Sequence, residues 1–164
     1  MPDTVFLDDR IEVSRPMPFP ANVIFDIVRS PEGHVAIDAS GMLQDFTGVP
    51  AEKVGDKFVI HMDRESLNDF PLGKYDVTVR IITFDKDKEI AWDLETALDI
   101  KHYYGYRLEP MDDGGTLVTQ FYDWSQINDE WKERNIFPVV PESALRATLG
   151  ILERTARQRS KASA

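Results

Sequence analysis

The pattern of apolar residues changes its period along the chain, and its clearest part lies near the C-terminus. Over 138–159, apolar residues recur at steps of three and four, which places them on one side of a helix. The residues that share this side are Leu145, Thr148, Leu149, Leu152 and Ala156. The pattern predicts one long amphipathic helix, and its apolar side must pack against another element, for which a β-sheet is the best candidate.

The preceding part of the chain alternates with a period of two. Ile11 and Val13 predict a short first strand, and two short helices are expected between Pro20 and Gly41. From Met42 onward, alternation and β-branched residues predict six further strands, at 42–47, 57–62, 75–84, 90–95, 103–111 and 116–124. The Asp-Asp-Gly-Gly sequence at 112–115 is typical of a hairpin turn, because glycine readily adopts positive φ.

This order predicts an α+β fold of the form β-α-α-β6-α. We expect a curved antiparallel sheet of about seven strands that wraps around a long C-terminal helix. The length of 164 residues suits one domain, which we place at 10–160. Residues 1–9 are predicted to be a flexible leader and residues 161–164 a disordered tail.

Composition and charge narrow the classes of partner. The chain carries 29 acidic and 19 basic residues, for a net charge of −10, which disfavours nucleic acid and anionic membrane surfaces. No apolar run approaches the ~20 residues needed to cross a bilayer, so no membrane insertion is expected. The chain has no cysteine, which excludes disulfides and thiolate metal sites and is consistent with the cytoplasm.

Several short segments resemble a known superfamily. They are Ala-Asn-Val-Ile-Phe-Asp-Ile-Val at 21–28, Val-Gly-Asp-Lys-Phe at 54–58, Ile-Ala-Trp at 90–92, Tyr-Arg-Leu-Glu-Pro at 106–110 and Gly-Gly-Thr-Leu-Val-Thr at 114–119. In this order they resemble the START-like superfamily, also called SRPBCC or the Bet v 1-like helix-grip fold. Within it, the bacterial polyketide cyclase/dehydrase and lipid transport group is the most similar. The resemblance covers residues 10–158.

The resemblance has implications for fold and function. It implies a sheet that grips the C-terminal helix, with a cavity between them. Members of the superfamily bind lipids, polyketides, aromatic compounds or hormones, and a minority catalyse reactions. Their catalytic residues differ from branch to branch, so the resemblance assigns no catalytic position in this chain.

The alternation also indicates which strand residues face the helix. Arg107, Glu109 and Asp123 prefer water, so their strand neighbours are expected to point inward. The inward-facing residues include more hydroxyl and amide groups than a core without ligand or water favours, since such groups need hydrogen-bond partners when they are buried. We therefore predict a ligand pocket lined by Trp92, Tyr104, Tyr106, Gln120, Tyr122 and Trp124 from the sheet and by Leu145, Leu149 and Leu152 from the helix. The alternative is that the tyrosines lie at the wet rim of the sheet and that Gln120 is bonded internally.

Candidate catalytic residues are few. His34 and Asp38 lie four residues apart on the second short helix, where they could share a side and form a general base. The alternative is a solvent-facing pair near the pocket mouth. His61 is expected at the surface, whereas His102 lies in a segment without a clear pattern. Neither a metal-ligand spacing nor a Gly-x-Ser-x-Gly sequence is present, so we expect no metal and no cofactor.

Three hypotheses for function remain open at this point. The first is a carrier or sensor of a small hydrophobic or aromatic molecule, lipid-like or polyketide-like in character. The second is a polyketide cyclase or dehydratase that uses a pocket tyrosine or the His34/Asp38 pair as acid and base. The third is a protein-interaction module, which would need an exposed apolar patch. Monomer and homodimer are both compatible with the sequence.

Overall fold

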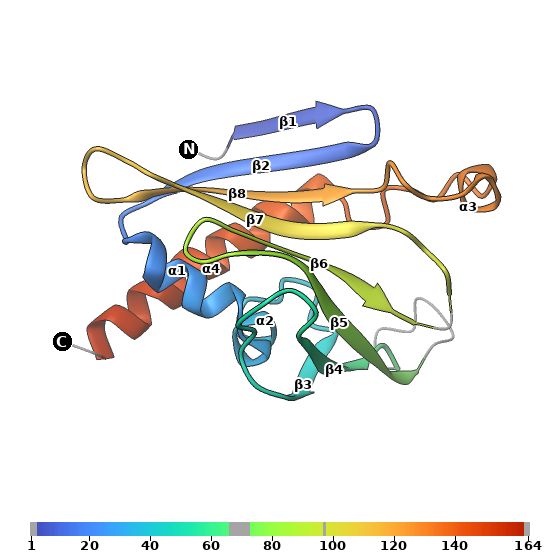
Figure 1. Ribbon diagram of the computed structural model, residues 1–164, viewed down its shortest axis with the longest axis horizontal. Coiled ribbons are helices and arrows are strands. Elements are labelled where there is room, and N and C mark those ends of the chain that lie inside the picture. Colours follow the sequence, from blue (N-terminus) through green and yellow to red (C-terminus); the bar gives the residue numbers. More distant parts are fainter. Residues whose placement is uncertain (1–2, 66–72, 97, 163–164) are drawn as a thin grey trace.

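The computed structural model describes residues 3–65, 73–96 and 98–162 of the chain. It shows an α+β fold in which one antiparallel sheet is combined with four helices (Figure 1). The strands are β1 (Asp3–Leu7), β2 (Arg10–Met17), β3 (Leu43–Thr47), β4 (Lys57–Asp63), β5 (Lys74–Asp85), β6 (Glu89–Glu95), β7 (Tyr103–Pro110) and β8 (Thr116–Asp123). The helices are α1 (Ala21–Val28), α2 (Pro31–Ala36), α3 (Asp129–Glu133) and α4 (Glu142–Ala162).

The sheet is curved and open, with the order β1-β2-β8-β7-β6-β5-β4-β3. From β3 to β8, each strand pairs in antiparallel fashion with the next strand in the sequence. β2 pairs instead with β8, which is distant from it in the sequence. The predicted turn at 112–115 joins β7 to β8, and Gly114 has the positive φ of 88° that such a turn requires. The predicted fold class is therefore confirmed, with eight strands in place of about seven.

The additional strand lies in the segment that was expected to be a flexible leader. Asp3–Leu7 pair with β2 at the edge of the sheet, and the Thr4 hydroxyl donates a hydrogen bond to Glu142 on α4 at 2.8 Å. Val5, Phe6 and Leu7 remain 50%, 66% and 53% exposed. Because this strand buries neither face, its sequence carries no alternation that could have revealed it. Residues 1–2 lie outside the described residues.

Three helices cover one face of the sheet. α1 packs against β7 and α4, α2 packs against β3 and β4, and α4 packs against β2 and β8. The Ser30 hydroxyl caps α2 by accepting a hydrogen bond from the Gly33 N–H. A Cβ atom on Gly33 would lie 1.8 Å from the Ile27 carbonyl oxygen, so glycine is required for this close approach of α2 to α1.

The long C-terminal helix has the predicted apolar side. Leu145, Leu149, Leu152 and Ala156 are buried in the main core. On the same side, Arg15 of β2 forms an ion pair with Glu153, with 3.1 Å between Nε and Oε1. α4 extends to Ala162, so residues 161–162 of the predicted disordered tail are helical, and residues 163–164 lie outside the described part. No helix in the described part of the chain combines the length and apolar character that a membrane span requires.

Candidate functional site

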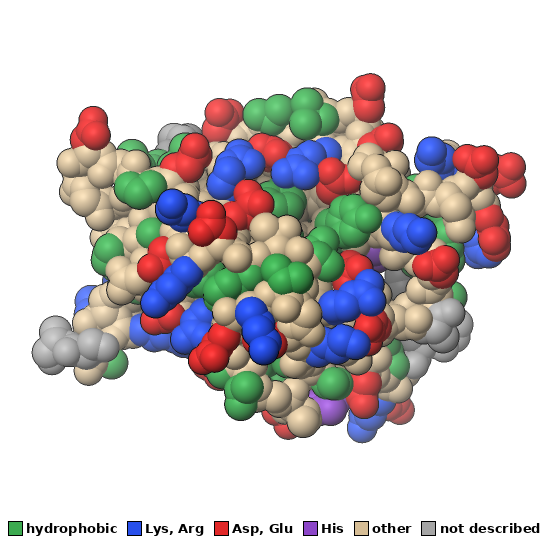
Figure 2. Space-filling view, viewed as in Figure 1, with side chains coloured by type: hydrophobic (Ala, Val, Ile, Leu, Met, Phe, Trp, Pro, Cys, Tyr) green, Lys and Arg blue, Asp and Glu red, His purple; other side chains and the backbone are tan. Residues whose placement is uncertain are grey.

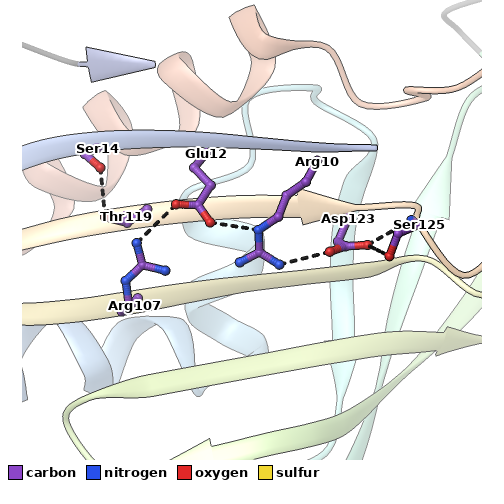
Figure 3. Close-up of polar contacts among 7 residues, drawn as sticks. All are labelled: Arg10, Glu12, Ser14, Arg107, Thr119, Asp123 and Ser125. Carbon is purple, nitrogen blue, oxygen red and sulfur yellow. Dashed lines mark hydrogen bonds and ion pairs between the residues drawn. The ribbon is translucent and has the colours of Figure 1, made fainter. Parts of the chain in front are cut away.

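The residues predicted to face the helices form two rows across the sheet, which we call the inner wall. Strand register aligns Ile11, Tyr122, Tyr104 and Trp92 in one row and Val13, Gln120, Tyr106 and Ile90 in the next. The residues that alternate with these rows along the strands, such as Glu12, Ser14 and Arg107, lie on the opposite face, where Figure 3 shows them. The inner wall therefore consists of the inward residues of β2, β8, β7 and β6.

Aromatic rings run along the inner wall in continuous contact. Trp92 stacks on Tyr104 with ring centroids 6.0 Å apart, Tyr104 contacts Tyr122 at 4.8 Å, and Tyr122 contacts Trp124 at 5.4 Å. Leu145, Leu149 and Leu152 of α4 belong to the same buried cluster as Trp92, Tyr106, Tyr122 and Trp124. The structure thus brings the predicted lining residues into one region of the core, and their role in ligand binding remains a prediction.

The predicted His34/Asp38 pair is not formed. His34 is buried, and its Nε2–H donates to the Val28 carbonyl oxygen at 2.8 Å, while its ring lies 4.7 Å from that of Trp92. Asp38 instead accepts hydrogen bonds from Ser40 and from the Leu43 N–H. α2 ends at Ala36, so Asp38 is not on the helix and the spacing of four no longer places the two side chains together. The solvent-facing alternative is also wrong for His34.

Burial makes His34 a weak base. Loss of hydration lowers its pKa to about 4, although the hydrogen bond to the Val28 carbonyl opposes this change. A general base works best when its pKa lies near the working pH. His34 therefore stays neutral at pH 7 and is better suited to filling the space beneath Trp92 than to removing a proton.

His102 is the polar residue of this region that sequence reasoning missed. It immediately precedes β7, and its Nδ1 lies 2.7 Å from the Tyr122 hydroxyl. Burial lowers the pKa of His102 to about 4, with the Asp93 carboxylate opposing the shift. A signal was present in the sequence, because 102, 104 and 106 have the same parity and therefore share one face of an extended strand.

The three tyrosines of the inner wall remain protonated. Burial raises the pKa values of Tyr104, Tyr106 and Tyr122 above the ordinary value of 10.0. The hydroxyl groups of Tyr104 and Tyr122 interact with each other, and Tyr122 also bonds to the Val139 backbone. These groups can donate and accept hydrogen bonds, but their raised pKa values make them poor proton donors in catalysis.

Two neighbouring polar groups of the inner wall have no hydrogen-bond partner. Gln120 is buried, and no donor in the described part of the chain reaches its Oε1 atom. Tyr106 lies directly opposite on β7, and its hydroxyl forms no hydrogen bond to any described residue. A buried acceptor without a partner costs about 1–3 kcal/mol. The alternative that Gln120 is bonded internally is therefore wrong.

Two surface hollows border β4, and neither includes a residue of the inner wall. Tyr104, Leu94, Met62 and Tyr75 point inward near the ends of their strands and are only partly buried. A surface hollow of about 510 Å³ includes Met62 and Tyr75 in its lining, and a second of about 330 Å³ lies beside Arg29 and Lys57. No residue of α4 lines either hollow.

His61 lies on the outer face, as its position in β4 indicates. Its Nδ1 is 2.7 Å from an Asp76 carboxylate oxygen, and its Nε2 is 2.8 Å from the Thr47 hydroxyl. These contacts link the three neighbouring strands β3, β4 and β5. His61 is partly exposed, in accord with the surface position expected for it.

Comparison with known proteins identifies the fold. No family model matches the chain, and no curated protein matches it. Among solved structures, a protein from Mycobacterium smegmatis is similar, with 14% identity, a TM-score of 0.66 and coverage of 96% of this chain and 98% of that one. A Rhodobacter sphaeroides protein has 14% identity, a TM-score of 0.67 and coverage of 96% and 99%.

A third solved structure is also similar in fold. It is an AHSA1-like protein from Aeromonas hydrophila, with 12% identity, a TM-score of 0.60 and coverage of 92% of this chain and 94% of that one. Identities this low establish the fold alone. The chain has the START-like, Bet v 1-like helix-grip fold that its sequence resembles.

Proposed function

We propose that this helix-grip protein binds a small hydrophobic or aromatic molecule, lipid-like or polyketide-like in character, against the inner wall. The observation that carries the proposal is the buried Oε1 atom of Gln120, which has no hydrogen-bond partner among the described residues. A core that only had to be stable would gain from an apolar side chain at this position. A bound molecule that supplies the missing partner explains why glutamine is present.

The surroundings of Gln120 suit an apolar guest. Trp92, Tyr104 and Tyr122 offer ring faces, while Leu149 and Leu152 of α4 contribute to the same core. Binding sites for small molecules combine such apolar surface with a few placed polar groups. The partly exposed Tyr104 and Leu94 mark the end of the wall from which a guest can enter.

A ligand at the inner wall also requires a cavity. Because no residue of α4 lines either hollow, we expect α4 or α2 to move away from the inner wall when the ligand enters. Such movement links binding to a change of conformation, with a cost that lowers the apparent affinity. Hydrogen exchange of the α4 and α2 amides should therefore differ between the ligand-free and the ligand-bound protein.

The proposal is tested by reducing the space on the helix side. Leu149→Phe adds bulk against the inner wall, while Ala147→Phe adds a phenyl ring at an exposed position of the same helix. Native mass spectrometry of gently purified protein should detect a retained small molecule on the wild type and on Ala147→Phe, but not on Leu149→Phe.

Titration with 1-methylnaphthalene, followed by tryptophan fluorescence, provides a second readout for the same three proteins. Equal binding by both phenylalanine variants would place the site elsewhere. Absence of a retained molecule, together with no response to 1-methylnaphthalene in the wild type, would overturn the proposal.

A further inference from the structure

We infer that the ligand is uncharged and carries a hydroxyl group, which donates a hydrogen bond to Oε1 of Gln120 and accepts one from the Tyr106 hydroxyl. This inference rests on the proposed function and specifies the chemistry of its ligand. It follows from the position of two unpaired groups, from what each can donate or accept, and from the absence of charge in the rows that hold them.

The two groups belong to residues that lie directly opposite each other on neighbouring strands. Tyr106 and Gln120 are directly opposite in the β7–β8 register, so their Cβ atoms are about 5 Å apart. Both side chains point to the inner face, between Val13 on one side and Ile90 on the other. The inference places one ligand hydroxyl oxygen between these two side chains, where it would bond to both.

The donor and acceptor inventory selects the ligand group. The Oε1 atom of a carboxamide only accepts, so its partner must donate, which ethers, ketones and carboxylates cannot do. The Tyr106 hydroxyl is free to donate, because it forms no other hydrogen bond to the described residues. A hydroxyl is the smallest group that donates to one neighbour and accepts from the other.

The surroundings also exclude a charged ligand. The two rows of the inner wall hold Ile11, Tyr122, Tyr104, Trp92, Val13, Gln120, Tyr106 and Ile90, none of which is ionised. Arg15 of β2 also faces α4, but it is paired with Glu153, which Arg157 holds as well. An ion buried beside these rows would lose its hydration without gaining a countercharge.

Two probes of similar shape separate the hydroxyl from the apolar surface. The first is 1-naphthol, and the second is 1-methylnaphthalene, in which a methyl group replaces the hydroxyl. The dissociation constants are measured for the wild type, Gln120→Leu and Tyr106→Phe. Gln126→Leu, a change of an exposed glutamine six residues away, is the matched control.

The wild type and Gln126→Leu should prefer 1-naphthol about tenfold, the ratio expected for one hydrogen bond to a buried group. In Gln120→Leu this preference should disappear, while 1-methylnaphthalene still binds. Tyr106→Phe should reduce the preference and keep the ring that packs in the wall. A third probe, 1-naphthoate, should bind the wild type more weakly than 1-naphthol because it carries a charge.

The outcomes distinguish this inference from the proposed function. Equal affinity of the wild type for 1-naphthol and 1-methylnaphthalene would overturn the hydroxyl inference and leave an apolar binding site in place. A preference that persists in Gln120→Leu, or tighter binding of 1-naphthoate, would also overturn it. Failure of the wild type to bind either neutral probe would count against the proposed function itself. Circular dichroism of each variant shows that the fold is retained.

Discussion

Polar side chains on the outer face of the sheet have hydrogen-bond partners, whereas two polar side chains on the inner wall of the same strands have none among the described residues. On the outer face, Arg10 bonds to Glu12 at 2.7 Å and to Asp123 at 3.0 Å, and Arg107 bonds to Glu12 at 3.1 Å (Figure 3). Acidic and basic side chains are interspersed over this side of the molecule (Figure 2). On the inner wall, one residue away along β7 and β8, Tyr106 and Gln120 have unpaired polar groups.

The difference shows on which face of the sheet the polar groups are satisfied within the protein and on which face one is not. Outer polar groups find partners on neighbouring strands, as Ser14 and Thr119 do at 2.8 Å, and water can replace any partner that is lost. The Oε1 atom of Gln120 is shielded from water and has no partner among the described residues, so it carries a cost. A face that satisfies its own polar groups needs no ligand, whereas the unpaired group of the inner wall is the one that the proposed ligand would satisfy.

The largest expected effect is the response of the buried histidine to acid. The pKa of His34 is lowered from 6.5 to about 4 in the folded state, so the unfolded chain takes up the proton first. The contribution of neutral His34 to the free energy of unfolding is complete above pH 6.5. It is lost as the pH falls toward 4, and the loss from this residue amounts to about 3 kcal/mol. Urea unfolding at pH 7 and pH 4.5 should show a smaller loss in His34→Gln than in the wild type. An equal loss in His34→Gln and in the wild type would contradict the assignment.

Substitution of a glycine on the outer face should lower the free energy of unfolding almost as much. A Cβ atom on Gly105 would lie 2.3 Å from Cζ of Phe121 and 2.6 Å from the Ile90 carbonyl oxygen. Gly105→Ala should therefore lower the free energy of unfolding by about 2 kcal/mol, through displacement of Phe121. On α4, a Cβ atom on Gly150 would meet only Arg15, at 3.8 Å, so Gly150→Ala should instead stabilise by up to about 1 kcal/mol. Thermal and urea unfolding compare the two, and a loss of the same size in both would show that packing at Gly105 is not the cause.

The third effect is a gain in stability on removal of the unpaired acceptor of Gln120. Gln120→Leu removes the unpaired acceptor and keeps a side chain of similar size, so the ligand-free protein should gain about 1 kcal/mol. Urea unfolding of protein stripped of ligand measures the change. Destabilisation by more than about 1 kcal/mol would show that Gln120 already has a partner in the folded protein.

The smallest effect belongs to the ion pairs of the outer face. Arg107→Ala breaks the pair with Glu12, which remains bonded to Arg10. The loss should be below about 1 kcal/mol and should shrink further at high salt. A loss of several kcal/mol that is insensitive to salt would mean that the outer face, like the inner wall, depends on buried polar contacts.

Periodicity was sufficient to predict the parts of the fold that bury one face. The strands from Leu43 to Asp123 and the helix with Leu145 and Leu149 follow this rule. It could not reveal β1, because its apolar residues remain exposed on a sheet edge. It also misplaced the His34/Asp38 pair, because the end of α2 at Ala36 depends on tertiary contacts that a spacing of four does not report.

The sequence was sufficient to predict which residues face the inner side of the sheet, but not which of them form hydrogen bonds with each other. Alternation placed Tyr104, Tyr106, Gln120 and Tyr122 on one face, which the register confirms. Which of these groups pair with each other depends on distances across strands and on the segment around His102. That information arises only when the chain is folded, so the unpaired state of Gln120 could not be read from the sequence.

The most direct test of ligand binding at the inner wall uses the side-chain amide signals of two glutamines. In ¹⁵N-resolved NMR spectra, 1-naphthol should shift the Gln120 side-chain resonances in a saturable way, with the dissociation constant found by fluorescence. The resonances of the exposed Gln126 should remain in place. Equal shifts of both glutamines, or no shift at Gln120 at saturating probe, would contradict binding at the inner wall.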